Sequence, residues 1–106
     1  MMPRKKLEFY AAKHGIQDFA SVKMTAEEIA AICTEVGSSQ FGIPDCGGKI
    51  STLIDCITDD LLFKEKVKER VSAKGGDISE DFLAMRMADY AADEVMAAYS
   101  KVHGTV

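Results

Sequence analysis

The stretch SEDFLAMRMADYAADEVMAAYSKVH, residues 79–103, decides the fold of this 106-residue chain. Its small apolar residues recur at alternating spacings of four and three, which is the spacing of a heptad seam on one face of a helix. Because small side chains let another helix approach closely, the stretch predicts one long amphipathic helix that packs against helical neighbours. The seam residues are Ala84, Ala88, Ala91, Val95, Ala98 and Val102.

Shorter helices are predicted before this stretch. Pro3 and Gly15 bracket a helix at about residues 4–14. Thr25 and Glu28 have the spacing of a capping box, in which each side chain bonds the other residue's backbone N–H, and the helix that follows ends at Gly37.

Residues 50–74 contain two apolar helical stripes that are rotated relative to one another. The first stripe includes Ile50 and Ile57, and the second begins with Phe63. Asp59 and Asp60 lie at the change and suit the start of a helix, so we expect two helices that meet near residue 58. No segment alternates as a strand does. Residues 1–106 are therefore expected to form a single all-α domain, a compact bundle of five to six helices with a long C-terminal helix.

The composition is that of an ordinary globular domain with an acidic balance. Of all residues 47% are hydrophobic, and thirteen basic against seventeen acidic residues give a net charge of −4. Because affinity for nucleic acid comes mostly from Lys and Arg, nucleic acid is not the expected partner. No stretch approaches the roughly 18 apolar residues of a membrane span, and no apolar core of a signal peptide follows the basic start. Three cysteines, an odd number, indicate reduced thiols and predict a cytoplasmic location.

Residues that could carry chemistry are not grouped. Cys33, Cys46 and Cys56 lack the close spacing of metal ligands, and His14 and His103 lie near opposite ends of the chain. Neither histidine stands beside a nucleophile and a carboxylate in the sequence. We therefore expect no metal, no cofactor and no catalytic residue, and hence a protein that is not an enzyme.

One short segment is similar to a known motif. Residues 32–41, Ile-Cys-Thr-Glu-Val-Gly-Ser-Ser-Gln-Phe, resemble the helix-turn-helix core of AraC-type regulators, in which Val-Gly and Ser-Ser-Gln open the recognition helix. The turn is one residue shorter than in that family, and Gly42 and Pro44 interrupt the expected recognition helix. The resemblance implies an alternative function, a helix-turn-helix-like DNA-binding transcriptional regulator that uses residues 26–45.

The long helix is the predicted interface. About 25 residues at 1.5 Å each give some 37 Å, more than the roughly 26 Å expected for the diameter of such a domain, so a second chain, in a homodimer or a complex, is expected to cover part of it. We expect a small non-enzymatic protein-interaction module that binds and inhibits or modulates a larger macromolecule, as anti-activators and anti-CRISPR proteins do. The predicted partner-binding residues are Met85, Met87, Tyr90, Ala91, Met96 and Tyr99 on this helix, with Phe41 and Ile43 in the glycine-rich loop before residue 49.

Overall fold

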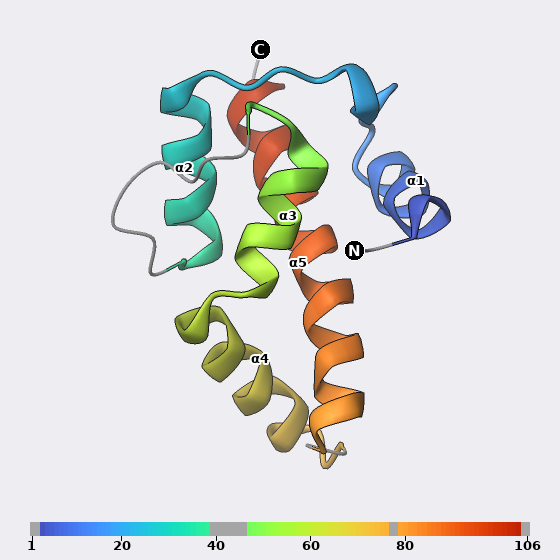
Figure 1. Ribbon diagram of the computed structural model, residues 1–106, viewed down its shortest axis with the longest axis vertical. Helices are drawn as coiled ribbons and strands as arrows, with labels where there is room; N and C mark the ends of the chain where they lie inside the picture. The colour runs from blue at the N-terminus through green and yellow to red at the C-terminus, as the bar shows by residue number, and fades with distance from the viewer. Residues whose placement is uncertain (1–2, 39–46, 77–78, 105–106) are drawn as a thin grey trace.

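The computed structural model describes residues 3–38, 47–76 and 79–104, and these contain five α-helices, one short 3₁₀ helix and no strand (Figure 1). The prediction of an all-α bundle with a long C-terminal helix is confirmed. The elements are α1 (Arg4–Lys13), η1 (Phe19–Ser21), α2 (Ala26–Val36), α3 (Ile50–Thr58), α4 (Leu61–Ala73) and α5 (Glu80–His103).

Local signals set the helix ends where the sequence predicted them. The Glu28 N–H donates to Thr25 Oγ1 at 3.1 Å, and the Thr25 N–H donates to Glu28 Oε1 at 2.9 Å, which is the predicted capping box. Gly37 ends α2 in the left-handed conformation with φ +73°. Asp60 begins α4 by accepting from the Phe63 N–H at 3.0 Å. The break near residue 58 is therefore confirmed as a junction between two helices.

Helix α5 is the centre of the molecule, and α1, α2, α3 and α4 all contact it (Figure 1). Helices α1 and α2 lie on opposite sides of its C-terminal half, and α4 runs antiparallel to its N-terminal half. Its 24 residues correspond to about 36 Å at 1.5 Å per residue, and the molecule measures 38 × 30 × 25 Å. The longest dimension of the molecule is therefore sufficient to contain α5 along its whole length. The length of this helix is then no argument for a second chain.

The C-terminal half of α5 is buried around most of its circumference. The seam residues Ala91, Val95 and Ala98 are buried, and so are Met96 and Tyr99 on other sides of the helix. Helix α1 covers the side of α5 that carries Asp89 and Asp93, where ion pairs accompany the apolar contacts. The pairs that join α5 to other elements include Lys6–Asp89, Lys13–Asp93 and His14–Asp93 toward α1, Arg70–Glu94 toward α4, and Lys101–Glu35 and His103–Glu28 toward α2.

Candidate functional site

Most of the predicted partner-binding residues of α5 lie inside the chain. Ala91 and Met96 are 0% exposed, and Met87 and Tyr99 are also buried. These side chains fill the core between α5 and its neighbours, which explains why the sequence placed them on an interface. A partner helix cannot reach Ala91 or Met96 unless the chain's own helices first separate.

Two of the predicted residues on α5 keep accessible surface. Met85 is 61% exposed in the N-terminal half of the helix. Tyr90 is partly buried, and the Arg70 guanidinium lies 5.5 Å from the centre of its ring. Phe41 and Ile43 lie outside the described residues, as does the segment in which the recognition helix of the AraC-type motif would fall.

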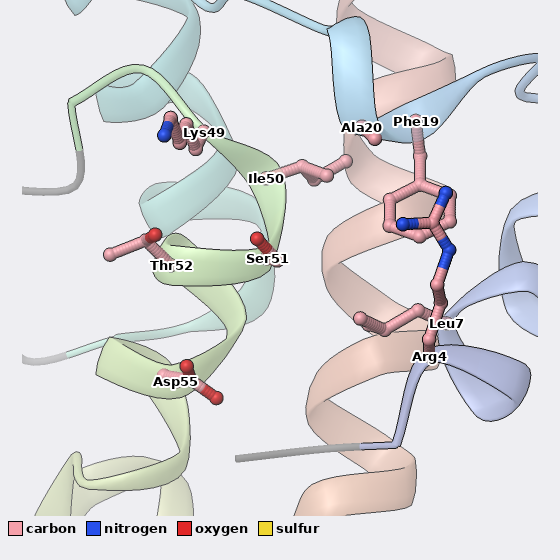
Figure 2. A pocket seen from close by; sticks show the side chains of 9 residues that line it. All are labelled: Arg4, Leu7, Phe19, Ala20, Lys49, Ile50, Ser51, Thr52 and Asp55. Atoms are coloured by element: carbon pink, nitrogen blue, oxygen red, sulfur yellow. The ribbon is translucent and has the colours of Figure 1, made fainter.

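The structure brings together a cleft that the sequence did not predict. It lies between α3 on one side and α1 with η1 on the other, and its volume is about 340 Å³ (Figure 2). The buried side chains of Leu7, Phe19 and Ile50 form its apolar floor. This volume is at the small end of the range for ligand clefts. The polar and small residues around it are Arg4, Ala20, Lys49, Ser51, Thr52 and Asp55.

Two contacts hold the walls of the cleft in place. The Met24 N–H donates to the Gly48 carbonyl at 2.9 Å, which ties the segment after η1 to the turn before α3. On the opposite wall the Arg4 guanidinium lies 5.8 Å from the centre of the Phe19 ring, and Figure 2 shows it beside that ring. Figure 2 also shows Ile50 pointing from α3 across toward η1. The cleft is therefore defined by contacts between residues that are 15 or more positions apart in the chain.

Positive charge gathers at the helix ends that border this cleft. Helix α1 begins with Arg4, Lys5 and Lys6, and α3 follows Lys49; neither helix has an acidic residue in its first turn. The N-terminus of a helix already carries partial positive charge, so cations there are disfavoured. Helices α2 and α5 follow the usual rule, with acidic residues in their first turns. The arrangement beside the cleft opposes helix stability and is therefore a candidate functional feature.

Several polar side chains around the cleft are available for contacts. Lys49, Ser51, Thr52 and Asp55 make no side-chain hydrogen bond or ion pair within the described part of the chain. Arg4 is engaged with Glu8 at 3.0 Å, but both side chains are more than half exposed. Exposed pairs of this kind contribute little to stability. A ligand could therefore recruit these groups without breaking a buried contact.

A second, smaller groove lies where α4 begins beside the first turns of α5. Its volume is about 230 Å³, and Leu61, which is 75% exposed, borders it. Ala84 and Met87 bring the N-terminal end of the alanine seam to this groove. Met87 is thus a predicted partner-binding residue that borders a hollow on the surface, and the seam residue Ala98 borders another hollow beside Glu35 and Lys101.

The two histidines have structural contacts. His14 Nε2 lies 2.6 Å from Asp93 Oδ1, and His103 Nδ1 lies 2.7 Å from Glu28 Oε2. Both contacts join α5 to another part of the chain. Among the described residues no group of three or more His, Cys, Asp or Glu side chains could hold a metal ion. No helix in the described ranges is long and apolar enough to cross a membrane.

The cleft residues escaped sequence reasoning because they come from two separate segments, residues 4–20 and 49–55. One signal was present, namely the cations at the starts of two helices. In a single sequence such a cluster is read as a solvated surface, since nothing shows that the two helix ends meet.

Comparison of the chain with protein-family models, with curated proteins and with solved structures found no match.

Proposed function

We propose that this chain is a non-enzymatic protein-interaction module that binds a larger macromolecule, a protein, and modulates or inhibits it. The observation that supports this most directly is the cleft between α1, η1 and α3, with its apolar floor and its unengaged polar side chains. Protein-binding surfaces combine an apolar centre with a polar rim in this way. The regulators that act in this way include anti-activators and anti-CRISPR proteins, and we propose a function of the same kind for this chain.

The exposed apolar side chains give secondary support. Leu61 and Leu62 stand next to each other at the start of α4, and both are exposed. Single exposed apolar residues are common on protein surfaces, but Leu61 also borders the smaller groove. A partner that covered the cleft and this corner would contact α3 at both of its ends.

Site-directed photo-crosslinking in the native cell tests the proposal. A benzoylphenylalanine in place of Thr52 reports on the cleft, and the same residue in place of Lys68, on the outer face of α4, is the matched control. We expect a defined protein adduct from position 52 that is absent from position 68. Adducts to nucleic acid alone, or no difference between the two positions, would contradict the proposal.

The sequence also predicts a homodimer, and this prediction is separate from the binding of another protein. A homodimer is tested in the same experiment, because an adduct between two copies has twice the mass of the chain. Sedimentation of the purified chain over a range of concentrations supplies the independent measurement. A single species of 11.5 kDa at all concentrations would contradict the homodimer.

A further inference from the structure

We propose that the cleft between α1, η1 and α3 binds an acidic segment of a partner protein that carries one large apolar side chain. This inference rests on the proposed function, and it names the chemistry of the partner at the same cleft. The apolar side chain would lie on Leu7, Phe19 and Ile50, and acidic side chains would meet Arg4 and Lys49 on the two walls.

Charge complementarity is the argument for an acidic segment. The chain as a whole has a net charge of −4, yet the charged residues that line this cleft are two cations, Arg4 and Lys49, and one carboxylate, Asp55. Lys5 and Lys6 follow Arg4 in the first turn of α1. Of these, Lys6 is engaged with Asp89 at 2.9 Å, whereas Lys5 and Lys49 have no side-chain partner in the described part of the chain. Such cations stabilise neither α1 nor α3, because they stand at the positive ends of both helices. A bound anionic group would be attracted by both the side chains and the helix ends.

The floor of the cleft argues for a peptide rather than for nucleic acid. Leu7, Phe19 and Ile50 lie at the base of the cleft and are 6%, 8% and 1% exposed, so the base is apolar and suits contact with an aliphatic or aromatic side chain rather than with a phosphate backbone. Nucleic-acid binding requires many phosphate contacts, and an acidic chain with a few local cations is poorly suited to it. Asp55 lines the cleft one turn after Ser51 on α3, and its carboxylate can accept hydrogen bonds from the peptide N–H groups of the bound segment.

The test uses the full chain and three labelled probes. Two are pools of 12-residue peptides with a central Phe, Leu or Met, flanked by Asp and Glu in one pool and by Lys and Arg in the other. The third is a 12-nucleotide single-stranded oligothymidine. Fluorescence anisotropy measures binding, and backbone amide shifts in NMR spectra locate it.

We expect the acidic pool to bind and to shift the amide signals of Phe19, Ile50 and Thr52. Lys49→Glu should weaken binding of this pool about tenfold, because it replaces an attraction by a repulsion. Lys68→Glu makes the same change of charge on the outer face of α4 and should leave binding unchanged. An acidic pool with Ala in place of the central apolar residue should bind more weakly than the parent pool, which tests the floor without altering the protein.

The outcomes separate this inference from the proposed function. Equal binding of the basic pool, equal effects of Lys49→Glu and Lys68→Glu, absence of amide shifts at the cleft, or preferential binding of the oligothymidine would each overturn the acidic-segment proposal. If a protein adduct from position 52 persists in the Lys49→Glu variant, the chain still binds a protein at the cleft, but the bound segment is not acidic. The proposed function would then be retained and the acidic-segment proposal rejected. Absence of any protein adduct from position 52 contradicts the interaction module itself.

Discussion

The backbone N–H of Met24 donates to the carbonyl oxygen of Gly48 at 2.9 Å, and this contact joins the segment that follows η1 to the turn that precedes α3. Gly48 has φ +76°, and a Cβ atom built on it would lie 3.1 Å from Met24 O. The contact holds the two walls of the candidate cleft together. Glycine favours this contact, because a Cβ atom at residue 48 would force the Met24 backbone to shift.

Gly48→Ala should therefore destabilise the fold and disturb the cleft. The left-handed backbone alone costs about 1–2 kcal/mol for a residue with a Cβ, and the close approach to Met24 adds to it. Gly47→Ala is the matched control, because Gly47 also has a positive φ of 62° but nothing within 4 Å of the added Cβ. Denaturant unfolding should show a larger loss for Gly48→Ala. Equal losses would show that the Met24 contact does not constrain the turn.

Asp60→Ala should lower the free energy of unfolding more than substitutions of exposed polar residues do. Asp60 is 4% exposed; its Oδ1 accepts from the Phe63 N–H, and its Oδ2 accepts from Ser38 Oγ at 2.8 Å. Loss of a helix cap together with a buried hydrogen bond is worth about 1–3 kcal/mol. Asp59→Ala, at an exposed neighbouring position, should cost much less. Thermal unfolding of the two variants side by side measures the difference, and similar melting temperatures would contradict the assignment.

Ala91→Glu should unfold the chain rather than release a partner. Ala91 is 0% exposed, so the substitution would place an unpaired charge and extra volume in the core. An unpaired buried charge costs about 3–5 kcal/mol. Ala84→Glu, on the exposed end of the same seam, should leave the circular dichroism spectrum and the melting temperature nearly unchanged. A folded Ala91→Glu variant with altered association would instead restore the seam as an interface between chains.

Stability should fall in acid, and Glu28 should account for part of the loss. The hydrogen bond from the Thr25 N–H, followed by that from His103, holds the pKa of Glu28 below its ordinary value. Burial raises the pKa of Asp93, but hydrogen bonds from His14 and Lys13 outweigh this and lower it. Because both pKa values are lower in the folded chain, the stability they contribute is present above the unfolded value of about 4 and is lost as pH falls through the folded values.

The measurement is the melting temperature between pH 6 and pH 3. Glu28→Gln keeps a carbonyl oxygen that can accept from Thr25 but cannot titrate. This variant should start less stable at pH 6 and lose less on acidification than the parent chain. Parallel pH profiles for the two proteins would show that Glu28 does not contribute.

Lys5→Glu should stabilise the fold slightly. The substitution replaces a cation by an anion in the first turn of α1, where the partial charge of the helix end is positive; the expected gain is about 0.3–1 kcal/mol. Lys5→Gln should give an intermediate value, and high salt should reduce both gains. Such a gain would mean that the natural sequence retains the cation at a cost in stability, as expected for a binding residue. No change, or a loss, would remove that argument.

The helices and most of their ends could be predicted from the sequence because the forces that set them act over a few residues. The capping box of Thr25 and Glu28, the left-handed Gly37 and the cap at Asp60 are each contained within one turn of the helix that they bound. The heptad spacing in residues 79–103 also correctly predicted a long helix, and its seam is buried at Ala91, Val95 and Ala98 but exposed at Ala84. These features follow from local hydrogen bonding and from the helical repeat.

Which surfaces cover one another was decided only in the tertiary structure. Periodicity shows that a helix face is buried, but it does not show what buries it, since that depends on how the connecting segments place the other helices. Thus Ala91 and Met96 face the chain's own core, and α1 covers the side of α5 that carries Asp89 and Asp93. The cleft arises for the same reason. Its walls come from two distant segments, and no local pattern records that Phe19 and Ile50 meet.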